Sequence, residues 1–404
     1  MKFDVFCEIQ RAFPWTDGQD EASLIADTLA QARAADAAGF EIWWQVEHHG
    51  APQFSYSSAP ELILAAIALS TRRLRVGHAG VLAPFRINNP LRVAERGAML
   101  DILSGGRFEL GLAKSGGKEW ETFGVDPQTA REEVREALQM IPRMWTKPEF
   151  SWNSPLIAIP PREVVPRPLQ QPHPRLWQTC GSPESFYMAG ELGVGALGTT
   201  LLSPVPVLGA MMREHDRGLA ACARPAGAVA NPQKGAFTFV HVAESRAAAI
   251  RNGAAWSALW YVNAAAVTFK VPRRVWYDMI KAGLHPNSVS ATQARQSLDP
   301  RETVIEADDP PALVLLKKMA QGREVSHEEA HEVLEALDCV VIGDPGACAA
   351  KLEAYQAIGV DRIMCMMQYG SLSHEAVTRS IALAGRQLIP AFAARGEAPS
   401  LQIG

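Results

Sequence analysis

The chain has 404 residues, of which 48% are apolar and 20% charged, and its net charge at pH 7 is −4. This balance is typical of a globular protein with a large core, and it excludes the basic surface that nucleic-acid-binding proteins need. No apolar run reaches membrane-spanning length, and the first residues lack a signal-peptide layout. The six cysteines are scattered without a C-x-x-C motif. We therefore expect a cytoplasmic protein.

Short apolar strands alternate with longer helices along the chain. The predicted strands are residues 3–9, 41–46, 74–82, 107–113, 175–180, 195–199, 235–243 and 360–367. The predicted helices are residues 21–40, 60–70, 89–105, 128–145, 183–192, 344–359 and 373–392. Repeated strand–helix units predict a parallel sheet, and eight strands favour a closed (β/α)8 barrel, the TIM barrel.

The chain is longer than such a barrel requires. A barrel usually takes about 250 residues, so about 150 belong to insertions and extensions. The main excess, 264–340, lies between the seventh and eighth strands. We expect a single domain over 1–404 in which this insertion shapes the substrate pocket. Five aromatic side chains could face an apolar or aromatic ligand there, or belong to the core: Trp256, Trp260, Tyr261, Phe269 and Trp276.

The stretch "SHEEAHEV" (326–333) contains the H-E-x-x-H pattern of zinc peptidases. On a helix, His327 and His331 would share one face with Glu328 as the base. We favour a different interpretation, in which Ser326 and Glu329 form a capping box at a helix start. Because a catalytic zinc also needs a third ligand and none is evident, we predict no metal site.

The stretch "GVGALG" (193–198) matches the G-x-G-x-x-G pattern of dinucleotide-binding folds. That motif must follow a strand and open a helix. Here it follows a predicted helix and runs into a strand. The chain therefore carries no credible nicotinamide-binding fingerprint.

In a TIM barrel, functional residues gather where the strands end. The second strand ends in Glu47-His48-His49, whose side chains alternate in direction and cannot easily chelate one ion. One of these histidines could exchange protons or anchor a ligand, or it could be structural. The third strand ends near Ala79 and Gly80, which are small enough for a flat ring to approach, or for tight packing.

Two further strand ends suit a phosphate group. Lys114 follows the fourth strand beside a Ser-Gly-Gly turn, where it could bind a phosphate or be solvated. Ser182 and Ser185 open a helix after the fifth strand, where backbone N–H groups and hydroxyls bind anions, or where Ser182 is only a cap. Together the four strand ends outline a site for a flat ring with a phosphate tail.

Five stretches, in this order, resemble the bacterial-luciferase-like, flavin-dependent monooxygenases: "AADAAGFEIWWQVEHH", "RLRVGHAGVL", "NNPLRVAERGAMLDILSGGRFELGLA", "PRPLQQPHPRLW" and "GDPGACAAKLEAYQAIGVDRIM". The resemblance covers the chain except for residues 250–340. It implies a TIM barrel that binds reduced FMN or, in some branches, a deazaflavin. It also implies a homodimer formed through barrel helices.

The resemblance assigns roles to the candidate residues. It places His48 next to the flavin ring as the catalytic residue, and a non-prolyl cis peptide at Ala79–Gly80 beneath that ring. It assigns the phosphate to Lys114, Ser182 and Ser185. Four charged residues around the third helix also match the family, and we expect them to form ion pairs that fix it to the barrel: Arg92, Glu95, Asp101 and Arg107.

Our hypothesis is a two-component monooxygenase. A flavin reductase acting in trans would supply FMNH2, and a flavin C4a-peroxide would transfer one atom of O2 to a small organic substrate. Ala113, Lys114 and Gly181 depart from the luciferase pattern and argue against light emission. The alternatives are a deazaflavin-dependent dehydrogenase or reductase on the same barrel, and a non-catalytic flavin-binding protein.

Overall fold

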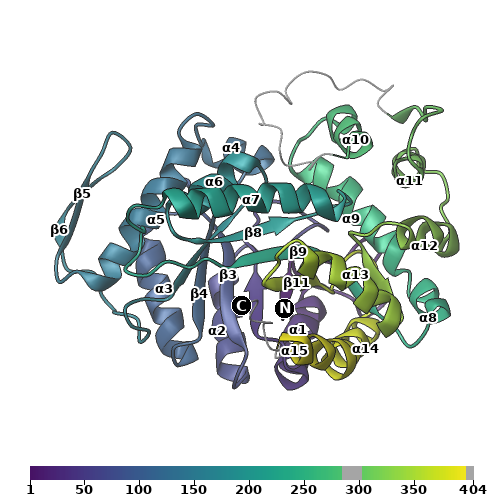
Figure 1. The fold of residues 1–404 in the computed structure, drawn as a ribbon, viewed down its shortest axis with the longest axis horizontal. Coiled ribbons are helices and arrows are strands. Elements are labelled where there is room, and N and C mark those ends of the chain that lie inside the picture. Colours follow the sequence, from purple (N-terminus) through teal and green to yellow (C-terminus); the bar gives the residue numbers. More distant parts are fainter. Residues whose placement is uncertain (284–302, 397–404) are drawn as a thin grey trace, which may run out of the picture.

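A closed ring of eight parallel strands forms the centre of the computed structural model, which describes residues 1–283 and 303–396 (Figure 1). The ring order is β1 (Lys2–Cys7), β2 (Ile42–Gln45), β3 (Arg75–Leu82), β4 (Phe108–Ala113), β7 (Arg175–Thr179), β8 (Gly195–Thr199), β9 (Lys234–Val242) and β11 (Arg362–Met366). Pairing of β11 with β1 closes it. The predicted TIM barrel is confirmed, with each strand within one or two residues of its predicted bounds.

Helices follow the strands and cover the outside of the barrel (Figure 1). They are α1 (Glu21–Ala38), α2 (Pro60–Ser70), α3 (Pro90–Ser104), α4 (Gly117–Phe123), α5 (Ala130–Thr146), α6 (Pro183–Glu191), α7 (Val205–Ala221), α13 (Pro345–Ala357), α14 (His374–Leu383) and α15 (Ile389–Gly396). Asn89 caps α3 ahead of Pro90, as predicted. Among the helices described, none is both long and apolar enough to cross a bilayer.

The chain contains two segments in addition to the strands and helices of the barrel. The segment between β9 and β11 contains α8 (Arg246–Arg251), α9 (Ala254–Thr268), α10 (Arg273–Lys281), α11 (Pro311–Ala320), α12 (His327–Glu335) and β10 (Val341–Gly343). It therefore begins before, and ends after, the predicted insertion of residues 264–340. Residues 284–302 of that prediction lie outside the described residues. An unpredicted hairpin, β5 (Phe150–Asn153) and β6 (Ala158–Arg162), projects from the barrel (Figure 1). Pro160 and Pro161 argued against a strand, but a two-stranded ribbon has free edges that tolerate proline.

Tryptophan rings close the amino end of the barrel interior. The rings of Trp44 and Trp177 meet edge to face, with centres 5.5 Å apart. Glycines opposite them provide the space, because a Cβ on Gly77 would lie 2.2 Å from the Trp44 ring and one on Gly195 would lie 2.3 Å from Trp177. The closed end forms the floor of the cavity above it.

Buried charges at this end are paired. Arg362 binds Asp4 at 2.7 Å, while Arg75 and Arg175 bind Glu109 at 2.6 and 2.5 Å. A buried charge without such a partner would cost several kcal/mol. These pairs therefore stabilise the barrel floor and take no part in the cavity.

The prediction of ion pairs around the third helix is wrong, because none of the four residues, Arg92, Glu95, Asp101 and Arg107, forms an ion pair within the described part of the chain. Asp101 accepts hydrogen bonds from the side chain of Gln170 at 2.7 Å and the backbone N–H of Phe108 at 3.3 Å. Arg107 donates to backbone carbonyls, among them that of Ala68 at 2.7 Å. The end of α3 is therefore held by hydrogen bonds to backbone groups and to Gln170, and not by ion pairs.

Candidate active site

A cavity of about 310 Å³ opens at the carboxyl ends of the strands. All six residues predicted for the site line it: His48, Ala79, Gly80, Lys114, Ser182 and Ser185. They come from four successive strand ends, which the closed ring brings together. We call this space the cofactor cavity.

Small residues form one wall of the cofactor cavity. Ala79, Gly80 and Ala113 line it, and the Ala79–Gly80 peptide is cis, as the resemblance implied. A Cβ on Gly80 would lie 2.9 Å from the Cβ of Ala113. Tight packing of β3 on β4 at Gly80 is therefore confirmed, and the approach of a flat ring to this wall stays a prediction.

His48 lies between two buried carboxylates. Its Nδ1 is 2.9 Å from Oε1 of Glu119, and its Nε2 is 3.6 Å from Oε2 of Glu8. Glu119, on α4, also accepts hydrogen bonds from the Ser115 hydroxyl at 2.5 Å and the His49 backbone N–H at 3.0 Å. Glu119 thus fixes the orientation of the imidazole and leaves Nε2 beside the cavity.

The two carboxylates keep His48 protonated at neutral pH. Burial alone would lower the pKa of the imidazole, but the charges of Glu8 and Glu119 raise the pKa to about 9. Burial would raise the pKa of Glu119, yet hydrogen bonds from His48 and Ser115 bring that pKa below its ordinary value. The cavity is therefore bordered by an imidazolium, which can donate a hydrogen bond or a proton.

Glu8 presents an unsatisfied oxygen in the same cluster. Its side chain lines the cavity, and its Oε1 accepts a hydrogen bond from the Tyr261 hydroxyl at 3.2 Å. Its Oε2 is buried without a hydrogen-bond partner among the described residues. Burial raises the pKa of Glu8, and the nearby His48 partly offsets this. A hydrogen-bond donor on a bound molecule would relieve a desolvation cost of about 1–3 kcal/mol.

His49 has a different role from His48. Its Nε2 is 3.1 Å from Oε1 of Glu47, and its ring packs against Phe123. Glu47 also accepts hydrogen bonds from Asn88 at 2.9 and 3.1 Å. Alternation therefore sends the two histidines to different partners.

The helix after β7 presents its amino end to the cavity. Ser182 caps α6, and its hydroxyl accepts a hydrogen bond from the Ser185 backbone N–H at 3.4 Å. The Ser185 hydroxyl in turn accepts from the backbone N–H groups of Gly181 and Ser182, at 3.2 and 3.0 Å. Ser182 is thus the predicted cap, and the positive end of the helix dipole faces the cavity beside both hydroxyls.

Two cations stand near this helix end. Lys114 follows β4 and Arg131 lies in the first turn of α5, and both line the cavity. Neither forms an ion pair with a carboxylate in the described part of the chain. Burial and the charge of Arg131 lower the pKa of Lys114. Two neighbouring cations that form no ion pair within the described residues, beside a helix amino end, fit a phosphate dianion.

Comparison with known proteins decides the family. The model of the luciferase-like monooxygenase family matches residues 1–362. The chain belongs to this family. The oxygenase component of flavin-dependent trigonelline monooxygenase from Acinetobacter baylyi is 31% identical over 204 residues, 50% of this chain and 55% of that protein. The 4-hydroxyprotoasukamycin monooxygenase of Streptomyces nodosus is 33% identical over 189 residues, 45% and 48% of the two chains. The chain spans about half the length of the curated relatives it matches.

Solved structures share the fold over nearly the whole chain. Monooxygenase RslO1 from Streptomyces bottropensis gives a TM-score of 0.73 at 21% identity, over 97% of this chain and 100% of that one. The F420-dependent tetrahydromethanopterin reductase of Methanopyrus kandleri gives 0.65 at 19% identity, over 97% and 99%. A type II Baeyer–Villiger monooxygenase from Pseudomonas putida, in complex with FMN, gives 0.69 at 14% identity, over 96% and 98%. These likenesses show the fold alone and do not choose the cofactor.

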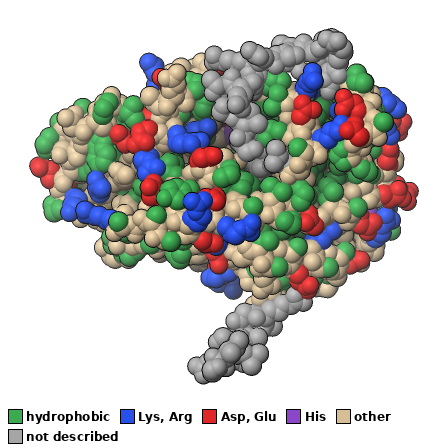
Figure 2. Space-filling view, turned by 45° about the horizontal axis from the view of Figure 1, so that its top comes forward, with side chains coloured by type: hydrophobic (Ala, Val, Ile, Leu, Met, Phe, Trp, Pro, Cys, Tyr) green, Lys and Arg blue, Asp and Glu red, His purple; other side chains and the backbone are tan. Residues whose placement is uncertain are grey.

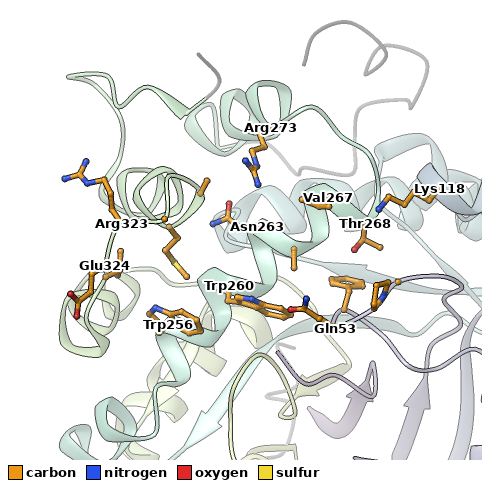
Figure 3. A pocket seen from close by; sticks show the side chains of 18 of the residues that line it. Gln53, Lys118, Trp256, Trp260, Asn263, Val267, Thr268, Arg273, Arg323 and Glu324 are labelled. Atoms are coloured by element: carbon orange, nitrogen blue, oxygen red, sulfur yellow. The ribbon is translucent and has the colours of Figure 1, made fainter. Parts of the chain in front are cut away.

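In this member of the luciferase-like monooxygenase family, the five aromatic residues lie in three different environments. Tyr261 and Phe269 line the cofactor cavity. Trp256 and Trp260 line a second cavity on another side of α9 (Figure 3). Trp276 is fully buried and belongs to the core. The sequence could not separate these environments, because all five residues are apolar and lie in or beside helices.

The zinc interpretation of residues 326–333 gains no support. Ser326 caps α12 by accepting from the Glu329 backbone N–H at 3.1 Å, as predicted. The second half of the capping box is wrong, because the Glu329 carboxylate binds Lys318 at 2.6 Å instead. His331 is buried, with neither ring nitrogen hydrogen-bonded within the described residues. In those same residues, the cluster with metal-ligand geometry comprises Glu306, Asp308 and Asp309, which Lys281 and Lys317 contact.

The glycines of "GVGALG" serve packing. Gly195 and Gly198 are in β8, after α6, so the order helix–strand is confirmed. A Cβ on Gly198 would lie 2.6 Å from the Phe186 ring. The glycines at 195 and 198 are thereby explained without a dinucleotide motif, since they provide space for the rings of Trp177 and Phe186.

Among the residues that sequence reasoning missed are Glu8 and Arg131, which line the cofactor cavity, and Glu119, which hydrogen-bonds to His48. Glu8 lies two positions beyond Phe6, which also lines the cavity, so strand alternation was a usable signal. Glu119 and Arg131 come from α4 and the start of α5. Their approach to His48 and Lys114 depends on how these helices lie over the barrel, for which the sequence holds no local signal.

Proposed function

We propose that this chain is the oxygenase component of a two-component, FMN-dependent monooxygenase. The observation that carries the proposal is the cofactor cavity. One wall of it consists of small residues, and Lys114 and Arg131 line it beside the amino end of α6. Such a cavity suits an isoalloxazine ring with a ribityl phosphate. The trigonelline relative is itself described as an oxygenase component, which supports a flavin reductase in trans.

FMN would bind with its ring against Ala79 and Gly80 and its phosphate near Lys114, Arg131 and Ser182. Reduced FMN supplies the electrons that activate O2, and one oxygen atom passes to the substrate while the other leaves as water. The chain's own residues orient the reactants and exclude water. Phe6, Phe237 and Tyr261 line the interior side of the cavity, and they keep it apolar.

His48 is the proposed catalytic residue. His48 lines the cavity, with Nε2 3.6 Å from Oε2 of Glu8, and Glu119 holds the ring in one orientation through Nδ1 at 2.9 Å. An imidazolium fixed in this way can stabilise negative charge on oxygen or deliver a proton to it. Glu8 would accept a hydrogen bond from the substrate, because its Oε2 has no hydrogen-bond partner within the described residues and lies 3.6 Å from Nε2 of His48.

Anaerobic titration of the apo-protein tests the cofactor. We expect reduced FMN to bind and deazaflavin to bind at least tenfold more weakly. Oxygen uptake with FMNH2 and a panel of small organic substrates then tests the reaction, because only an oxygenase couples uptake to an oxygenated product. Tight binding of deazaflavin but not FMN would support the deazaflavin oxidoreductase alternative. FMN binding without coupled product for any substrate would favour a non-catalytic flavin carrier.

A homodimer through α2 and α3 is part of the proposal. These helices pack together and are joined by the ion pair of Arg96 with Glu61 at 2.5 Å. Leu62 and Leu69 on α2 are 72% and 70% exposed, and α3 adds three partly exposed apolar side chains: Met99, Ile102 and Leu103. A contiguous apolar face of this kind is typical of a protein interface.

Light scattering during size-exclusion chromatography tests this interface. We expect the parent to have the mass of a dimer and the variant Leu62→Lys/Leu69→Lys to have that of a monomer, because charged side chains oppose burial of the face. Val229→Lys is the matched control, since Val229 is 50% exposed in a loop remote in sequence from both helices. A monomeric parent would refute the interface. The six free thiols are consistent with the cytoplasmic location that we propose.

A further inference from the structure

A second cavity, of about 690 Å³, lies beside α9 and is larger than the cofactor cavity. Trp256, Trp260, Ala264 and Thr268 follow one another at four-residue spacing, so a single face of α9 lines it (Figure 3). Tyr261 leaves α9 in another direction and lines the cofactor cavity. This helix is therefore a wall shared by the two cavities. We call the second one the outer pocket.

Phe54 separates the outer pocket from His48. Its side chain lines the outer pocket, and its ring centre lies 5.7 Å from that of the His48 imidazole. On the same side, the rings of Tyr261 and Phe269 lie 5.0 and 5.7 Å from it. A molecule in the outer pocket would thus be one aromatic ring away from the proposed reaction centre.

Unpaired positive charges line the outer pocket. Arg273 reaches from α10 toward Asn263 on α9, and Lys118 extends from α4 toward Thr268 (Figure 3). Within the described residues, the side chains of Arg273 and Lys118 form neither a hydrogen bond nor an ion pair. Their acidic neighbours are occupied, since Glu121 binds Lys270 and Asp278 lies 3.8 Å from Arg274.

The other charges of the outer pocket do not neutralise these two. Arg323 and Glu324 lie together at the opposite end of the pocket from Lys118 (Figure 3). On the wider molecular face in Figure 2, basic and acidic side chains intermingle. Arg273 lies between the pair at positions 323 and 324 and Lys118 (Figure 3), so the part of the outer pocket from Arg273 to Lys118 has a local excess of positive charge.

We propose that the outer pocket is the first binding site of the substrate, before it reaches the cofactor cavity, and that this substrate is a planar organic anion. Its ring would lie on Trp256 and Trp260, which offer large apolar surfaces. Its carboxylate or similar acid would pair with Arg273, whose guanidinium can donate two parallel hydrogen bonds. That the anion is the substrate rests on the proposed function, whereas binding of an anion in the outer pocket does not.

Calorimetric titration of the apo-protein with 2-naphthoate tests the site, and neutral 2-naphthamide serves as a probe of the same shape. We expect 2-naphthoate to bind about tenfold more tightly than the amide, because only the acid pairs with Arg273. Arg273→Gln should remove this preference. Arg274→Gln is the matched control, because it removes the same charge one position along the helix from a side chain outside the pocket. Its Kd should stay within twofold of the parent value.

Equal binding of 2-naphthoate to Arg273→Gln and the parent would overturn the proposal, as would no binding to the parent. If Arg273→Gln fails to fold, Lys118→Gln at an exposed position should reduce the preference for the acid. Saturating FMN should leave the Kd of 2-naphthoate unchanged. Displacement by FMN would place the anion in the cofactor cavity and refute the outer site. If FMN does not bind but the affinity for 2-naphthoate still depends on Arg273, the proposed anion site is supported and the proposed oxygenase function is refuted.

Discussion

His48→Gln is expected to lower the rate of product formation about 100-fold and to raise hydrogen peroxide release, with FMN affinity unchanged. Glutamine can still hydrogen-bond to Glu119, but it carries no proton that it can donate at neutral pH. The reduced oxygen would then escape as peroxide instead of reaching the substrate. Product by chromatography, peroxide by a coupled assay and FMN affinity by fluorescence are the three measurements.

His49→Gln is the matched control for that prediction. His49 is the next residue, but its ring nitrogen binds Glu47 at 3.1 Å and its side chain does not line the cofactor cavity. Its ratio of product to peroxide should match that of the parent. An unchanged ratio in His48→Gln would contradict the role assigned to this imidazole.

The pH dependence separates a proton donor from a purely structural histidine. Because its carboxylate neighbours raise the pKa of His48 to about 9, coupling in the parent should be constant near neutral pH and fall as the pH rises through about 9. His48→Gln should abolish that dependence. The same raised pKa adds folding stability that is fully present below the ordinary pKa of about 6.5 and is lost as the pH rises through about 9.

The strand ends of the site could be predicted from the sequence for a geometric reason. In a closed parallel ring, the carboxyl ends of all strands meet at one opening. Recognising the strands that precede His48, Ala79, Lys114 and Ser182 was therefore enough to bring these residues together. The alternation of side chains along a strand indicated that only one of His48 and His49 could face the cavity, and the family resemblance selected His48.

The parts that escaped prediction depend on how helices are placed. Glu119 reaches His48 only because α4 lies across the barrel mouth, and Arg131 approaches Lys114 from α5. The helical period puts Trp256 and Trp260 on one face and Tyr261 on another. It does not tell which face meets which cavity, because that depends on the packing of α9 against the barrel and the insertion.

The double variant Lys114→Gln/Arg131→Gln is expected to bind FMN at least 100-fold more weakly than the parent. A hydrogen bond to a charged group contributes about 1.5–3 kcal/mol, which corresponds to roughly 10- to 100-fold in Kd for each residue. Both side chains line the cavity without a carboxylate partner in the described part of the chain, so removing them leaves the phosphate without its counter-charges. Fluorescence titration measures the affinity.

Riboflavin decides whether the loss arises at the phosphate, because it has the same ring and ribityl chain but no phosphate group. Its affinity should change less than about threefold in the double variant, since neutral groups make only weak contacts with the two cations. Lys118→Gln is the matched control, as Lys118 follows Lys114 by four residues but lines only the outer pocket. Equal losses for FMN and riboflavin would mean that Lys114 and Arg131 shape the ring site instead, and the phosphate would then have to lie elsewhere than beside Ser182 and Ser185.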